Sequence, residues 1–202
     1  MCAVRHVASP VAAARAVMER TPHVLLAGPG ADAFAREAGL DGIPDDPVWF
    51  RLPVGVVPAD LEVEPDALAH GTVGAVALDA RGRLASATST GGLFGKRPGR
   101  VGDTALLGHG TWADERVALS CTGVGEAFIL AGGAADVAAR VRYGGQDLVE
   151  ACDSMLARVR ELGGDGGIIA LDAQGQHVWR WNSPGMKRAL CRAGGRPVVA
   201  ID

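Results

Sequence analysis

The sequence lacks several features that would assign it to a membrane or a nucleic acid. Across its 202 residues, no apolar run approaches the roughly 20 residues that a membrane-spanning helix needs. The opening segment MCAVRHVASP has no long apolar core behind a basic patch, so we expect no secretory signal. The formal net charge of −3 argues against a nucleic-acid partner held by phosphate charge. We therefore expect a soluble, cytoplasmic protein.

Closely spaced cysteines are also missing. The four cysteines are Cys2, Cys121, Cys152 and Cys191. They are far apart and form no CxxC pair, whereas zinc sites are typically built from closely spaced Cys and His ligands. We therefore expect four reduced thiols and no metal site.

The first part of the chain predicts helices followed by a linker. Ser9 and Pro10 suit the N-cap and the first position of a helix over VAAARAVMER. HVLLAG predicts a short buried strand, and ADAFAREA predicts a second helix. Over residues 40–71 prolines recur and no periodicity persists, which indicates a loop or flexible linker.

Regular structure resumes after the linker. Residues 72–90 form a predicted strand hairpin, and RVALSCTGVGE predicts a strand that ends in a glycine turn. Helical spacing covers residues 126–143 and 146–162, and GGIIALDAQGQHVWRWN predicts a last hairpin, whose two tryptophans we expect to pack rather than to bind a ligand. Strands, then helices, then strands favour a single domain over residues 1–202 with an α+β fold.

A threonine that directly follows a glycine opens the first strand after the linker. The Thr72 hydroxyl is a poor nucleophile on its own and needs an adjacent base. If the bond between Gly71 and Thr72 breaks, the freed α-amine can supply that base, because part of it is uncharged near neutral pH. Gly71 lacks a Cβ, so it can adopt the backbone geometry that lets the hydroxyl reach the preceding carbonyl. Taken alone, this pair is weak evidence, because most threonines in such a position are ordinary strand residues.

Four segments in a fixed order carry a family resemblance. They are GTVGAVALD, ATSTGG, PGRVGD and TGVGE, which begin at residues 71, 87, 98 and 122. In this order and at these spacings, the chain closely resembles the plant-type asparaginase and isoaspartyl peptidase family of N-terminal-nucleophile hydrolases. The resemblance covers residues 70–185 and continues upstream into RHVASPVAAARAVMER and the residues after it.

The resemblance implies a catalytic role for four residues. Thr72 would be the nucleophile, and the Thr90 hydroxyl would hydrogen-bond to it and orient its amine and hydroxyl. The Thr122 hydroxyl and the Gly123 backbone N–H would form an oxyanion hole. The alternatives are an ordinary strand threonine at Thr90 and a glycine-rich turn at Thr122 and Gly123.

Three further residues would bind the substrate. By the same resemblance, Arg100 would hold the substrate carboxylate and Asp103 its ammonium group, with the Gly125 carbonyl as a further acceptor. An exposed ion pair between Arg100 and Asp103 is the alternative.

The family also implies a fold and an activity. We expect a four-layer αββα sandwich that cleaves itself into residues 1–71 and 72–202 and assembles as a homodimer of cleaved protomers. It would hydrolyse the side-chain amide of L-asparagine and of isoaspartyl dipeptides to release L-aspartate, without a cofactor. A truncated, inactive relative that serves only as an association partner and a glycosylasparaginase are the alternatives.

The sequence departs from the family pattern upstream. The His-Gly-Gly-Ala-Gly strand and the Asn-Ala-Gly segment of the family are not found before residue 4. In the family this region supplies sheet strands and a loop that binds a structural alkali cation. Without those strands, we expect unpaired strand edges and an apolar face that favours association. A fragment and a natural short form remain open.

Overall fold

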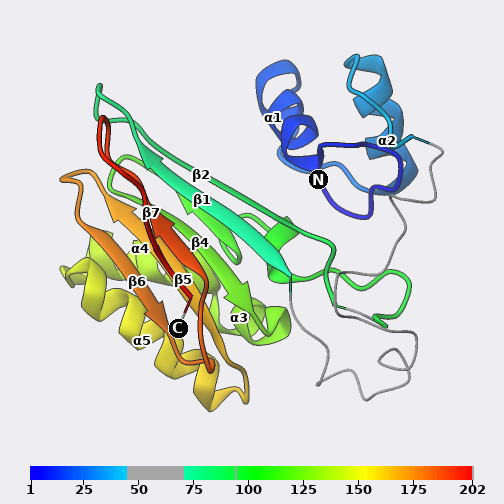
Figure 1. Ribbon diagram of the computed structural model, residues 1–202. Helices are drawn as coiled ribbons and strands as arrows, with labels where there is room; N and C mark the ends of the chain where they lie inside the picture. The colour runs from blue at the N-terminus through cyan, green and yellow to red at the C-terminus, as the bar shows by residue number, and fades with distance from the viewer. Residues whose placement is uncertain (45–70, 94, 202) are drawn as a thin grey trace. The chain divides into compact units, whose positions relative to one another are not determined.

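The computed structural model describes residues 1–44, 71–93 and 95–201 (Figure 1). The chain divides into two compact units, one of residues 1–71 and 91–101 and the other of residues 72–90 and 102–202. One boundary between the units falls between Gly71 and Thr72. Most of the predicted linker, residues 45–70, lies outside the described residues.

Two helices dominate the described part of the first unit. They are α1 (Pro10–Arg20) and α2 (Gly28–Glu37). The predicted cap of α1 is confirmed, because the Ser9 hydroxyl accepts a hydrogen bond from the Ala12 N–H at 3.4 Å. The strand predicted over HVLLAG is wrong: of this segment only Ala27 forms a bridge, to Cys2, and Val24 is 77% exposed. Among the described residues no strand pairs with the rest of this segment, and its apolar run is irregular.

The second unit contains antiparallel strands and three longer helices. The strands are β1 (Thr72–Leu78), β2 (Leu84–Thr90), β3 (Thr111–Ala113), β4 (Val117–Gly123), β5 (Gly166–Asp172), β6 (His177–Trp181), β7 (Arg188–Leu190) and β8 (Val198–Ala200). The helices are a short 3-10 turn, η4 (Asp103–Ala105), followed by α3 (Gly125–Ala131), α4 (Gly133–Gly144) and α5 (Leu148–Glu161). Strands β3, β4, β5 and β6 form one sheet in that order, while β1 pairs with β2 and β7 with β8.

The β1–β2 hairpin lies against one face of the four-stranded sheet (Figure 1). Two hydroxyls of β2 bridge the layers: Ser86 Oγ donates to the Leu119 carbonyl at 2.6 Å, and Thr88 Oγ1 lies 2.8 Å from Ser120 Oγ. Opposite them on β1, a Cβ on Gly74 would collide with the Ser120 side chain. Small and hydroxylated side chains therefore let the two β layers approach closely.

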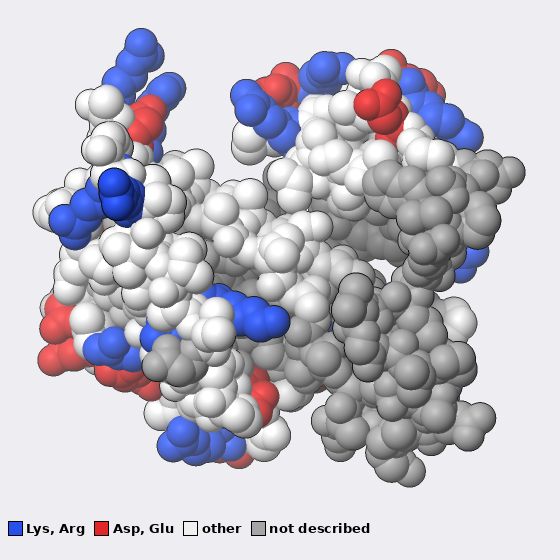
Figure 2. All heavy atoms as spheres, viewed as in Figure 1, with Lys and Arg blue, Asp and Glu red and all other residues white. Residues whose placement is uncertain are grey.

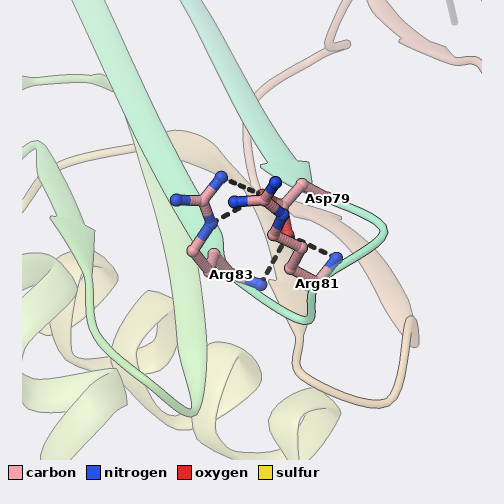
Figure 3. Close-up of polar contacts among 3 residues, drawn as sticks. All are labelled: Asp79, Arg81 and Arg83. Carbon is pink, nitrogen blue, oxygen red and sulfur yellow. Dashed lines mark hydrogen bonds and ion pairs between the residues drawn. The ribbon is translucent and has the colours of Figure 1, made fainter.

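The turn of this hairpin is closed by one carboxylate (Figure 3). Asp79 Oδ1 accepts the backbone N–H groups of Arg81 and Arg83 at 2.8 and 2.9 Å, and Asp79 Oδ2 accepts Arg83 Nε at 2.7 Å. The backbone and side-chain hydrogen bonds from Arg83 hold the pKa of Asp79 below its ordinary value. These contacts fix the register in which Thr72 lies opposite Thr90.

Helices α3, α4 and α5 cover the other face of the four-stranded sheet and enclose the main apolar core. Its largest fully buried members are Leu119 on β4, Phe128 on α3, Met155 on α5 and Ile168 on β5. The Asp147 carboxylate caps α5 by accepting the Glu150 N–H at 2.9 Å.

The single helix predicted over residues 126–143 is interrupted between α3 and α4. Gly132 adopts the left-handed conformation, with φ of 79°, and ends α3. The His109 carbonyl then accepts the Ala134 N–H at 2.9 Å, and a Cβ on Gly133 would collide with that same carbonyl. The loop before β3 therefore caps α4 from outside, which helical spacing alone did not predict.

The helices and antiparallel sheets confirm the predicted α+β fold class. In the second unit the order is hairpin, sheet and helices, with the β7–β8 hairpin as a separate sheet. Within the described residues, no helix combines the length and apolarity needed to cross a bilayer.

Candidate active site

Thr72 is the first residue of β1, directly after Gly71, as the sequence predicted. Thr72 is half-buried and pairs across the hairpin with Thr90. Because directly opposed residues of an antiparallel pair share a face, the Thr72 and Thr90 side chains extend from the same side of the hairpin. Gly71 is exposed, so the bond that precedes the candidate nucleophile lies at the surface of the described structure.

The orientation of β1 brings Thr72 to one end of the underlying sheet. Gly74 lies over Ser120 in the middle of β4, and Leu78 Cδ2 lies 3.9 Å from the position a Cβ would take on Gly175. Gly175 belongs to the β5–β6 turn, beside Asp172, which pairs with the first residue of β4, Val117. Strand β1 therefore runs opposite to β4, so Thr72 lies toward the end of β4 formed by Thr122 and Gly123.

Thr122 and Gly123 end β4 in a backbone arrangement that requires glycine. Gly123 has φ of 136°, and a Cβ there would collide with the Asp165 carbonyl and the Gly166 Cα. Thr122 is two residues from Ser120 and so faces the hairpin as Ser120 does. The Thr122 side chain therefore extends toward the hairpin layer that carries Thr72.

Asp103 lies beside the same end of β4, on the edge away from β5. Its carbonyl accepts the Gly110 N–H at 3.0 Å, and the Gly110 carbonyl accepts the Cys121 N–H at 2.9 Å. Burial raises the pKa of the Cys121 thiol well above its ordinary value, and the nearby Asp103 carboxylate raises it further. Asp103 is 6% exposed, which means that a cation bound to its carboxylate would be largely shielded from water.

The remaining predicted site residues divide between the two units. Gly125 is buried at the start of α3, two residues beyond Gly123 and in the second unit. Arg100 is half-buried and belongs to the first unit, where its N–H donates to the Arg97 carbonyl at 3.1 Å. Its role in holding a substrate carboxylate stays a prediction, as does the carbonyl contact assigned to Gly125.

A layer of hydroxyls beneath the site was not predicted. Ser86 Oγ lies 3.0 Å from Thr111 Oγ1, and Thr88 Oγ1 lies 3.3 Å from the Gly110 carbonyl and can donate to it. With Ser120, these side chains join the hairpin to β3 and β4. The signal was present in the alternation of LASAT (residues 84–88) and LSCT (residues 119–122), which places hydroxyls on one face of each strand.

The outer face of the hairpin differs from the inner one. It carries Val73, Ala75, Ala77, Ala85 and Ala87, all exposed. Figure 2 shows that uncharged side chains cover most of the visible surface over β1 and β2. Proteins often associate through exposed apolar faces of this kind, and self-association of this chain stays a prediction.

In this α+β unit, Thr72 follows a glycine, opens a strand and lies toward the turn formed by Thr122 and Gly123. This arrangement is typical of N-terminal-nucleophile hydrolases. The chain belongs to the asparaginase family, whose model matches residues 1–50 and 54–201. The family resemblance inferred from the four segments is therefore confirmed, and the match extends beyond residues 70–185 at both ends.

Curated proteins similar to this chain are named as peptidases and asparaginases. The isoaspartyl peptidase of Escherichia coli (strain K12) is 44% identical over an alignment 211 residues long. This alignment covers 98% of this chain and 66% of that protein. The isoaspartyl peptidase of Salmonella typhimurium is 45% identical, with 98% and 67% covered. The isoaspartyl peptidase/L-asparaginase of Bos taurus is 40% identical, with 95% and 64% covered. The chain thus spans about two thirds of the length of these relatives.

Proposed function

We propose that this chain is a β-aspartyl amidohydrolase that releases L-aspartate from L-asparagine and isoaspartyl dipeptides. The observation that carries the proposal is the position of Thr72, at the start of β1 and toward the end of β4 that holds Thr122 and Gly123. The names of the relatives, isoaspartyl peptidase and isoaspartyl peptidase/L-asparaginase, support the choice of substrate.

The reaction begins with self-cleavage between Gly71 and Thr72, which frees the Thr72 α-amine. The exposure of Gly71 and the unit boundary at this bond support this step. The fragments are residues 1–71 and 72–202. The stacking of hairpin, sheet and helices in the second unit supports the four-layer αββα sandwich as the complete architecture.

In the substrate reaction, the Thr72 α-amine removes the hydroxyl proton as the Thr72 oxygen attacks the side-chain carbonyl carbon. The negative charge that develops on the carbonyl oxygen is stabilised by the Thr122 hydroxyl and the Gly123 N–H, an effect of roughly 3–4 kcal/mol for a well-placed donor. The carbon–nitrogen bond then breaks, and the departing amine takes the proton held by the α-amine. Water hydrolyses the resulting ester and regenerates the Thr72 hydroxyl.

The other site residues bind the aspartyl part of the substrate. Asp103 holds the substrate ammonium group in its buried position beside Cys121. Arg100 holds the α-carboxylate, Gly125 offers its carbonyl to the ammonium group, and Thr90 orients Thr72. No cofactor or metal takes part in this scheme, and the active form is a homodimer of cleaved protomers.

Aspartate release from β-aspartyl-leucine and from L-asparagine tests the proposal. The wild-type chain should release aspartate from both, and Thr72→Ala should abolish release from both. Val73→Ala is the matched control, because Val73 is the next residue, is 72% exposed and lies on the opposite face of β1. A Thr72→Ala variant that hydrolyses both substrates at the wild-type rate would contradict the proposal. An uncleaved, inactive wild-type chain would favour the inactive relative instead.

A further inference from the structure

The edge strand β6 carries an aromatic strip on the face that bears the hairpin. His177, Trp179 and Trp181 alternate along β6, and the His177 and Trp179 rings meet edge to face at 5.4 Å. The intervening side chains face the helices: Val178 is in the apolar core, and Arg180 Nε forms an ion pair with Asp153 of α5 at 2.9 Å. The two tryptophans therefore lie on the same side of the sheet as the candidate active site.

Trp181 lies in the same cross-strand row as Thr122. Thr122 pairs with Gly167, and Gly167 pairs with Trp181, so all three positions share one face. Two inter-strand spacings separate Thr122 from Trp181, about 10 Å. Between them Gly167 has no side chain, and a Cβ there would collide with the sulfur of Met186. This row of positions thus leads from Thr122 across the Met186 thioether to the Trp181 indole.

A cation lies over this indole. The Arg188 guanidinium carbon is 4.2 Å from the centroid of the Trp181 ring and 5.5 Å from that of Trp179. Arg188 Nη1 also donates to the Met186 carbonyl at 2.9 Å, which ties the guanidinium to the residue that covers Gly167. Cation–π contact and this hydrogen bond hold a positive charge next to an apolar surface.

Asp103 and Trp181 lie on opposite sides of Thr122. The Asp103 segment runs along the edge of β4 that faces β3, and Trp181 lies beyond β5 on the other edge. If the substrate ammonium is held at Asp103 and the scissile carbonyl at Thr122, the leaving amine points toward Gly167 and Trp181. The leaving group of an isoaspartyl dipeptide is an amino acid, which has a side chain and a carboxylate.

We propose that Met186, Trp181 and Arg188 form the leaving-group subsite of this enzyme. This inference rests on the proposed amidohydrolase function. The indole and the thioether contact an apolar side chain of the departing residue, and Arg188 attracts its carboxylate. L-Asparagine releases only ammonia, which reaches none of these groups. The subsite therefore favours isoaspartyl dipeptides with an apolar second residue over free asparagine.

The test compares kcat/KM for β-aspartyl-leucine and for L-asparagine in each variant. Trp181→Ala should lower the value for the dipeptide about tenfold, the scale of a lost apolar contact, and leave that for asparagine within about twofold. Trp181→Phe keeps an aromatic surface and should retain most of the dipeptide rate. Tyr143→Ala is the matched control, because Tyr143 is an 80% exposed aromatic on α4, in the helical layer. This variant should leave kcat/KM unchanged for both substrates.

A second variant tests the carboxylate contact without removing the ring. Arg188→Gln should lower kcat/KM for β-aspartyl-leucine about tenfold. It should leave kcat/KM unchanged for β-aspartyl-leucinamide, which has no terminal carboxylate. Lys187→Ala removes the adjacent exposed cation and should leave kcat/KM unchanged for both the dipeptide and its amide.

Equal losses for asparagine and the dipeptide in both Trp181→Ala and Arg188→Gln would overturn the subsite while leaving the proposed function intact. A wild-type chain that hydrolyses neither substrate would instead overturn the proposed function and the subsite with it.

Discussion

Replacement of Gly74 by alanine should separate the two β layers that carry the site. A Cβ at Gly74 would collide with both Oγ and Cβ of Ser120, and β4 holds Ser120 between its buried neighbours Leu119 and Cys121. Neither atom is the far end of a flexible chain, so the hairpin must shift. Overpacking of this kind costs about 1–3 kcal/mol in the free energy of unfolding. For a chain of this size the melting temperature should fall by roughly 2–4 °C per kcal/mol.

The same collision can be relieved from the other side. Ser120→Gly alone should destabilise, because it removes the 2.8 Å contact with Thr88 Oγ1 and places a glycine within a strand. The double variant with Gly74→Ala should be more stable than the sum of the two single effects predicts, by about 1–2 kcal/mol. Ala75→Val, on the exposed face of β1, is the control and should stay within about 0.5 kcal/mol of wild type.

Urea unfolding of the wild type, the two single variants, the double variant and the Ala75→Val control measures this coupling, and aspartate release reports whether Thr72 still reaches the oxyanion donors. We expect Gly74→Ala to lose activity as well as stability, and the double variant to regain part of both. Additive free energies, within about 0.5 kcal/mol, would refute the close approach of Gly74 to Ser120 on which the orientation of β1 depends.

Three further predictions follow from single contacts. Thr122→Val removes a proposed oxyanion donor and should lower kcat for aspartate release by about 10²–10³ with little change in melting temperature; an unchanged kcat would exclude that role. Asp79→Asn should destabilise the chain at neutral pH but not in acid: the folded-state pKa of Asp79 is depressed, so its stabilisation is present above the unfolded-state pKa and is lost as the pH falls through the folded value. Thermal unfolding at several pH values checks this, and a pH-independent effect would contradict it. With a thiol reagent at pH 8, exposed Cys191 should react in the native state, whereas the buried Cys121 and Cys152 should react only after unfolding, because burial raises the pKa of Cys121 well above its ordinary value and that of Cys152 to about 12. Rapid native-state labelling of all three thiols would contradict the packing of β4 against α5.

Local sequence patterns predicted the elements whose partners lie nearby in the chain. The β1–β2 hairpin follows from alternation on both sides of a short polar turn, and the α1 cap follows from Ser9 and Pro10. Thr72 at a strand start after a linker was also readable, because a change from irregular to periodic sequence marks it. The roles of Thr72, Thr122 and Gly123 came from the family resemblance rather than from the periodicity.

Features set by distant residues were not predictable in the same way. The break at Gly132 depends on a carbonyl from His109, more than twenty positions earlier. Within the part of the chain that the structure describes, HVLLAG forms only the bridge from Ala27 to Cys2. The β6 tryptophans pack as expected, but their contact with Arg188 was not predictable, because Arg188 follows a loop and a change of direction. Spacing along the chain contains no information on such tertiary contacts.

Release of Thr72 as a nucleophile by self-cleavage is tested most directly by the intact mass of the purified chain after incubation at neutral pH. We predict two masses, those of residues 1–71 and 72–202, and a single uncut mass for Thr72→Ala. A wild-type chain that stays uncut, or a Thr72→Ala variant that is cut at the same bond, would contradict it.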